Sequence, residues 1–159
     1  MVYKILKIQD NNKKTEYANI ILRKLPEWFG NEKSLIDYTN TVKKQPFFAA
    51  FDNENCIGFF SGKIHYNRTG DLHVLGVDPN YHGRGIGTLL YKELEKYFLE
   101  KKCEYIIVKT LSEIVKYIPY LKTKAFYQKM GFKELVTLTE MWDKDNPCLI
   151  MIKNIQHNI

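Results

Sequence analysis

Cysteine is scarce in this sequence. Cys56, Cys103 and Cys148 are its only three, and they are far apart in the chain. An odd number of widely spaced cysteines favours neither a disulfide framework nor a metal cluster. Because each of them lies in or beside an apolar run, we interpret them as buried thiols and predict no metal site.

Long apolar runs are also missing. No stretch is long enough to span a membrane, and the segment after Met1 lacks the extended apolar core of a signal peptide. We therefore expect a cytoplasmic protein with no membrane partner. The 159 residues contain no repeat or low-complexity tract, and they fit a single domain over residues 1–159.

Acidic residues are outnumbered by basic ones. The chain has 24 lysines and arginines against 18 aspartates and glutamates, a net charge of +6. The lysines are scattered and no stretch forms a nucleic-acid motif, so nucleic acid is not an expected partner. The charge suits a polyanionic ligand, and it is equally compatible with an ordinary solvated surface.

Apolar patterning predicts alternating strands and helices. Strands are expected at residues 3–8, 47–51, 56–66, 72–77, 103–110, 133–139 and 148–153. Helices are expected at residues 15–25, 32–42, 86–98 and 125–130. The strands from 47 to 77 have short connections and must pair antiparallel, whereas the strand, helix, strand order from 72 to 110 requires a parallel crossover. The segment 111–123 is left unassigned, because Pro119 breaks the helical turn that precedes it.

A glycine-rich turn stands between the strand at 72–77 and the following helix. It reads His82-Gly83-Arg84-Gly85-Ile86-Gly87, and Thr88 follows. A helix that opens in this way presents unpaired backbone N–H groups and the positive end of its dipole, which together bind anions such as phosphate. Glycines allow a phosphate to approach the backbone without a side chain in the way.

Two common phosphate motifs do not fit this turn. A P-loop would require a lysine before Thr88, and a dinucleotide fingerprint would require a glycine at Thr88. The fingerprint would also place an acidic residue at the end of the next strand, where Lys109 and Thr110 stand. A plain turn before a helix is the structural alternative.

The turn resembles the coenzyme A loop of the GNAT superfamily of N-acetyltransferases, whose pattern is Arg/Gln-x-x-Gly-x-Gly/Ala. Gly85 and Gly87 fill the glycine positions, Arg84 is the frequent basic residue, and His82 stands where the superfamily has Arg or Gln. Further along, Phe126-Tyr127-x-x-x-Gly131-Phe132 resembles the C-terminal signature of the same superfamily. The resemblance covers residues 47–153.

The resemblance implies an α/β (α+β) fold of the GNAT type. Its central mixed sheet would have six to seven strands, largely antiparallel, with one parallel crossover and about four flanking helices. It also implies acetyl-coenzyme A as the acetyl donor. The expected donor-binding residues are Leu75, Gly76 and Val77 along the pantetheine arm, Tyr127 near the sulfur, and His82, Gly83, Arg84, Gly85, Ile86, Gly87 and Thr88 around the pyrophosphate.

The resemblance further implies a direct transfer to an amine. Tyr127 is the expected general acid toward the sulfur, and a main-chain N–H near Leu75 the oxyanion donor. Asp71 is the expected base, acting through a water, with His73 as the alternative. By the period of two, both should share a strand face with Leu75 and Val77. Each of these side chains has a purely structural alternative as a packing or hydrogen-bonded residue.

The acceptor is expected to be a primary amine of a small molecule or a protein. Its pocket should be built from Trp28, Phe29, Tyr120 and the rest of segment 111–123, with Trp142 as a further candidate. An acyl-coenzyme A binding or sensing module without transfer activity is the alternative function, and a nucleotide-binding regulator is a third. Many relatives pair as dimers, so a homodimer is one expected assembly.

Overall fold

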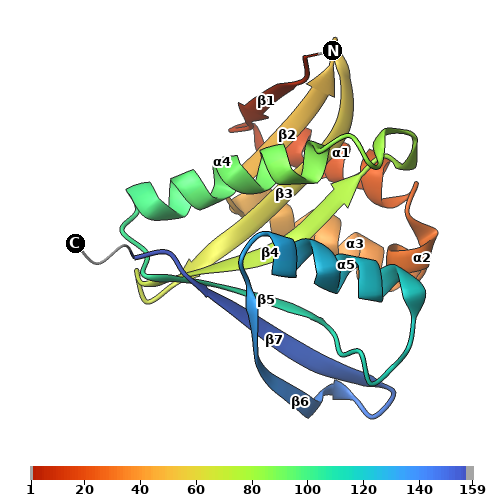
Figure 1. The fold of residues 1–159 in the computed structure, drawn as a ribbon. Helices are drawn as coiled ribbons and strands as arrows, with labels where there is room; N and C mark the ends of the chain where they lie inside the picture. Colours follow the sequence, from red (N-terminus) through yellow and green to blue (C-terminus); the bar gives the residue numbers. More distant parts are fainter. Residues whose placement is uncertain (1, 157–159) are drawn as a thin grey trace.

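The backbone of the computed structural model is described for residues 2–156, and its centre is one seven-stranded sheet (Figure 1). The strand order is β1-β2-β3-β4-β5-β7-β6, and every neighbouring pair is antiparallel except β4 and β5. This confirms the predicted mixed sheet. The strands are β1 (Lys4–Lys7), β2 (Phe47–Asp52), β3 (Asn55–His65), β4 (Thr69–Val77), β5 (Tyr105–Leu111), β6 (Lys133–Asp143) and β7 (Asn146–Asn154).

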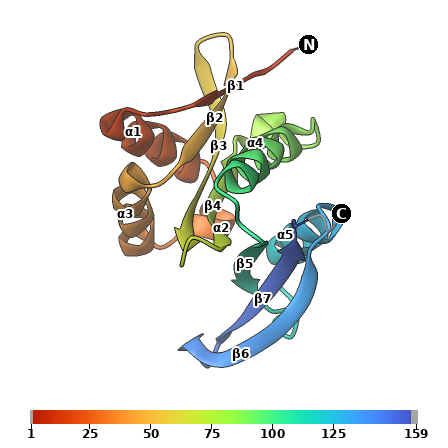
Figure 2. The same cartoon turned by 90° about the vertical axis from the view of Figure 1, so that its left-hand side faces the viewer.

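Helices cover both faces of the sheet (Figure 2). The helices α1 (Asn11–Leu22) and α3 (Glu32–Thr41) lie on one face, and α4 (Ile86–Glu100) and α5 (Ile118–Lys129) lie on the other. The short α2 (Pro26–Phe29) connects α1 and α3. None of the helices over residues 2–156 is long and apolar enough to cross a membrane.

The sheet divides the core into two parts because alternate strand residues point to opposite faces. On β2, Phe47 and Ala49 pack with α1 and α3, whereas Phe48 and Ala50 pack with α4. The predicted strand positions largely coincide with the observed strands. The parallel crossover through α4 is also confirmed.

Three helix predictions need correction. The first helix begins at Asn11, because the Asp10 side chain accepts from the N–H groups of Asn12 and Lys13 and caps it. The aromatic stretch after Pro26 is helical, so residues 2–156 contain five α-helices where about four were expected. Pro119 lies in the first turn of α5, where its missing N–H is not needed, so it begins the helix that was expected at residue 125.

The pairing of β4 with β5 ends early. Thr69 to Leu72 pair with Tyr105 to Val108, and no pair follows along the rest of β4. Beyond that point β4 stays with β3 and β5 stays with β7, as far as Val77 and Leu111 respectively. The two central strands therefore diverge and leave a gap in the sheet.

A bulge in β4 coincides with the divergence. Ser61 is opposite Val74 and Gly62 is opposite Leu72, so His73 is an extra residue on β4. A bulge reverses the alternation of side chains beyond it. Leu72 and Leu75 both pack toward α4, and Val74 packs with α1.

The prediction that Asp71, His73, Leu75 and Val77 share one face is therefore wrong. It assumed an unbroken period of two. Leu75 and Val77 lie on the α4 face, whereas the His73 ring lies against Tyr38 of α3 on the opposite face.

Gly70 provides a test of the packing between β4 and α4. A Cβ atom at Gly70 would lie 2.6 Å from Cδ2 of Phe98, a fully buried ring of α4. We predict that Gly70→Ala lowers the free energy of unfolding by about 1–3 kcal/mol, measured by urea denaturation. Because the clash is with one ring, Gly70→Ala combined with Phe98→Leu should cost less than the sum of the two single changes. An unchanged stability of Gly70→Ala would contradict this packing.

Candidate active site

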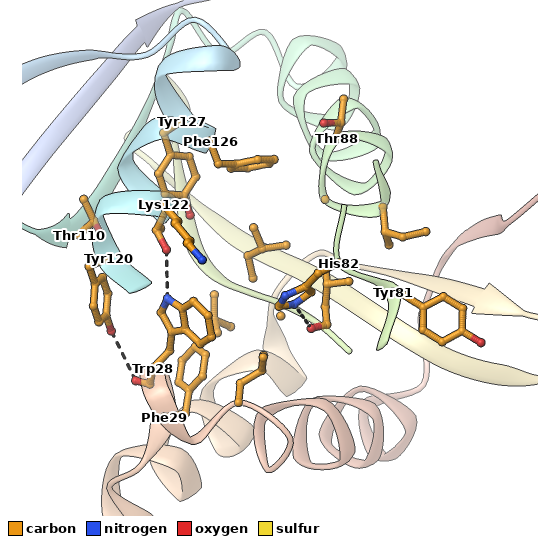
Figure 3. Close-up of a pocket in the computed structure, with 18 of the residues that line it drawn as sticks. Trp28, Phe29, Tyr81, His82, Thr88, Thr110, Tyr120, Lys122, Phe126 and Tyr127 are labelled. Atoms are coloured by element: carbon orange, nitrogen blue, oxygen red, sulfur yellow. Dashed lines mark hydrogen bonds between the residues drawn. The ribbon is translucent and has the colours of Figure 1, made fainter. Parts of the chain in front are cut away.

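A cavity of about 540 Å³ lies at the gap between β4 and β5 (Figure 3). Its lining comes from α2, the second half of β4, the glycine-rich turn, the first turn of α4, the end of β5 and α5. Segments distant in sequence therefore meet around the place where the sheet opens. The glycine-rich turn lines one part of the cavity and α2 and α3 line another, and the His82 and Trp28 rings meet between them.

The turn forms an anion-binding end. Gly83 and Gly85 have φ of 76° and 78°, and a Cβ atom at either would meet nothing within 4 Å. Gly85 is the N-cap of α4 and its own side chain cannot cap the helix, so the N–H groups of Ile86, Gly87 and Thr88 begin it uncapped. The open space, the free N–H groups and the dipole of a 15-residue helix fit a pyrophosphate.

His82 and Arg84 make contacts within the protein. The His82 ring donates from Nε2 to the Val77 carbonyl at 2.8 Å, and its ring lies edge-on to Trp28. Arg84 donates to the Tyr3 hydroxyl at 3.1 Å and lies over the Tyr81 ring. His82 lines the cavity, whereas Arg84 lies outside the lining.

The second half of β4 presents an open strand edge. The Asp78 N–H donates to the Ile57 carbonyl at 2.8 Å, and hydrogen-bonded pairs alternate along an antiparallel ladder. Gly76 is therefore bonded to β3, and Leu75 and Val77 turn their backbone groups to the other side, toward the gap. An extended ligand can pair with those groups as an additional strand would.

Tyr127 of α5 lines the cavity, and Figure 3 shows its ring directed into it. The side chain is buried and packs against Phe126 and Phe132. Burial, with a smaller effect from nearby Tyr120, raises the pKa of the Tyr127 phenol. The phenol is therefore protonated at neutral pH and can donate a proton or a hydrogen bond.

Asp71 lies behind the cavity wall. Its Oδ2 accepts from His65 Nε2 at 2.7 Å and from Lys109 Nζ at 3.0 Å, and only 3% of its side chain is exposed. Asp71 is not among the lining residues, whereas Lys109 is. The carboxylate thus holds the Lys109 ammonium in place from behind the cavity wall.

His73, the extra residue of the bulge, lines the cavity directly. Its Nε2 is buried without a hydrogen-bond partner among the described residues. Burial lowers the pKa of His73, and the charges of Lys63 and Lys109 lower it further against the opposing effect of Asp71. At pH 7 the imidazole is therefore neutral, with one ring nitrogen that no protein group engages.

The wall formed by α2 and α5 is aromatic and is held by hydrogen bonds between the two helices. Trp28 donates from Nε1 to Thr123 Oγ1 at 3.1 Å, and the Tyr120 hydroxyl donates to the Trp28 carbonyl at 3.4 Å. Trp28, Phe29 and Tyr120 all line the cavity, as expected for a ligand pocket. Trp142 lies on β6, half exposed and outside the lining.

Lys122 and Thr123 line the cavity and belong to the expected segment 111–123, whereas Tyr38, Lys109, Thr110 and Lys129 were not predicted. Lys122 and Lys129 are four residues before and three residues after Phe126, so all three side chains share one face of α5. This spacing indicates a shared face only because α5 extends from Ile118 to Lys129. No group of three or more potential metal ligands occurs in the described part of the chain.

The family comparison agrees with this architecture. The acetyltransferase (GNAT) family model matches residues 15–132. The chain therefore belongs to the acetyltransferase (GNAT) family.

Individual relatives are distant. An uncharacterized N-acetyltransferase of Methanocaldococcus jannaschii is 26% identical over 108 residues, which are 67% of this chain and 65% of that protein. The matched region is thus less than two thirds of that relative's length. An aminoglycoside 6'-N-acetyltransferase complexed with coenzyme A is 22% identical with a TM-score of 0.77, covering 100% of this chain and 99% of that one. The ribosomal-protein-S18-alanine N-acetyltransferase of Escherichia coli is 17% identical with a TM-score of 0.76, covering 99% and 97%.

The environment of His73 leads to a titration prediction. The His73 imidazole should titrate below its ordinary pKa of about 6.5, as measured by NMR of the ring protons. Because Lys63 contributes to the lowering, Lys63→Met should move this pKa upward. As pH falls through the ordinary pKa, the unfolded chain takes up a proton that the folded protein does not, so this contribution to stability declines. A His73 pKa above its ordinary value would contradict the described environment.

Proposed function

We propose that this protein is an N-acetyltransferase that transfers an acetyl group directly from acetyl-coenzyme A to a primary amine. One observation carries the proposal. A single cavity joins an anion-binding helix start, an open strand edge and a protonated buried tyrosine. The known acetyltransferases with the same fold, one of them complexed with coenzyme A, support it.

The donor would bind along the open edge of β4. The uncapped start of α4 would bind the pyrophosphate, and the backbone groups of Leu75 and Val77 would pair with the pantetheine arm. His82 already holds the Val77 carbonyl, so we expect it to rearrange or to share that group. When bound, acetyl-coenzyme A supplies a thioester whose carbonyl carbon is open to attack by an amine.

The residues around the gap can accept and donate the protons that this transfer requires. His73 lines the cavity and its imidazole is neutral, so we assign it to accept a proton from the ammonium of the acceptor, through a water molecule because its Nε2 is buried. The new carbon–nitrogen bond forms as the carbon–sulfur bond breaks. The Leu75 N–H stabilises the negative carbonyl oxygen, and Tyr127 gives its proton to the departing sulfur. The new amide nitrogen loses its remaining extra proton to solvent, His73 releases the proton that it accepted, and solvent returns a proton to Tyr127.

Asp71 has a different part in this proposal. Its Oδ2 is engaged by His65 and Lys109, and it lies behind the lining. We therefore assign the base to His73, and Asp71 is a positioning residue for Lys109.

Replacement of Tyr127 tests the function. Tyr127→Phe keeps the ring packing and removes the proton, so kcat should fall by about 10²–10⁴-fold while coenzyme A affinity stays nearly constant. Release of free thiol from acetyl-coenzyme A with a broad amine panel measures kcat, and calorimetry measures affinity.

The matched control is Tyr97→Phe on α4, which packs on Phe48 outside the cavity and should leave kcat unchanged. An unchanged kcat in Tyr127→Phe, with chemistry rate-limiting, would show that Tyr127 only packs. Coenzyme A binding without thiol release for any amine would instead support a sensing module.

A further inference from the structure

Apart from two histidines, the acidic and basic side chains that line the cavity are all of one kind, lysines. Its described lining contains the ammonium groups of Lys109, Lys122 and Lys129 but no aspartate or glutamate. A site that binds a polycation would be expected to supply carboxylates as partners. The lining instead repels additional positive charge.

The three lysines lie at different ends of the cavity. Phe126 contacts the position of Gly87 in the turn, and Lys129 is three residues further along α5, so Lys129 belongs to the anion-binding end. Lys122 is next to Thr123, which bonds to Trp28, so it belongs to the other end. Figure 3 shows the Lys122 ammonium directed into the cavity on the side of Trp28 and Tyr127. We call this the acceptor end, formed by Trp28, Phe29, Tyr38, His73, Tyr120, Lys109 and Lys122.

The Asp71 carboxylate behind the cavity wall is already paired with basic side chains. Asp71 accepts from Lys109 and His65 and is almost fully buried. Within the described residues, Lys122 has no carboxylate within salt-bridge distance. The acceptor end therefore offers a single uncompensated ammonium, which suits one negative charge.

The aromatic wall presents ring surface to a ligand. The Trp28 Nε1 and the Tyr120 hydroxyl are bonded within the wall, to Thr123 and to the Trp28 carbonyl. Phe29 has no polar atom in its side chain. The wall thus favours an apolar or aromatic body over a hydroxylated sugar, whose many donors and acceptors would lose water without gaining partners.

From these observations we infer that the acceptor is a primary amine that also carries a carboxylate and an apolar or aromatic body, as an apolar α-amino acid does. This inference rests on the proposed function and specifies its substrate class. The Lys122 ammonium pairs with the carboxylate, the aromatic wall covers the body, and the amine lies toward His73 and Leu75. Aminoglycosides and polyamines are excluded as preferred acceptors.

Matched substrate pairs test the inference. Thiol release is measured with phenylalanine and phenethylamine, leucine and isoamylamine, and tryptophan and tryptamine, with kanamycin and spermine as polycations. At least one amino acid should have a kcat/KM about tenfold or more above that of its decarboxylated partner, as a charge-assisted contact provides. Lys122→Met should remove that preference and leave the decarboxylated amine unaffected. The ratio of kcat/KM for an amino acid to that for its decarboxylated partner is compared between the wild-type and Lys122→Met enzymes. This comparison cancels the difference in basicity between the two amines.

Controls separate this inference from the proposed function. Lys92→Met, an exposed lysine of α4 outside the cavity, should keep the preference. Transfer to kanamycin, spermine or the decarboxylated amines in preference to the amino acids would overturn the inference and leave the acetyltransferase function in place. If Lys122→Met lowered kcat/KM equally for both members of a pair and also weakened coenzyme A binding by calorimetry, Lys122 would be a donor-binding residue. That result would also overturn the inference. Transfer to no amine at all would overturn the proposed function and this inference together.

Discussion

The arrangement of this protein depends on the early end of one parallel strand pair. β4 and β5 share only the pairs from Thr69 to Leu72, and the extra residue His73 coincides with their separation. A strand in the middle of a sheet normally has both edges paired, so backbone groups left free there need another partner. The cavity lies over those free groups, and under the proposed function an extended ligand pairs with them.

The same bulge places chemical groups on opposite sides of the gap. The ring of His73 lies toward α3 and Val74 packs with α1, whereas Leu75 and Val77 stay on the α4 side. Tyr127 reaches the gap from α5, on the α4 side. A neutral imidazole and a protonated phenol thus face one cavity from two faces of the sheet, so one can accept a proton while the other donates one.

The sequence predicted the positions of the strands and the glycine-rich turn, because both depend on local signals: apolar runs and turn residues. Trp28, Phe29 and Tyr120, expected in the acceptor pocket, and Tyr127, expected from the resemblance, all line the cavity. The position of Asp71 was not predictable, since its partners His65 and Lys109 come from two other strands. The bulge was not predictable either, because an extra residue is defined only against the partner strand. Pro119 was misinterpreted because proline both ends and begins helices.

The central claim is that acetyl-coenzyme A pairs with the open edge of β4, and amide hydrogen exchange by NMR tests it most directly. With the ligand at about 100 times its Kd, the N–H groups of Leu75 and Val77 should exchange on the order of a hundredfold more slowly, because only the free fraction exchanges. Gly76, between them, is already bonded to β3 and serves as the internal reference. Protection at the first turn of α4 with unchanged exchange at Leu75 and Val77 would contradict the account.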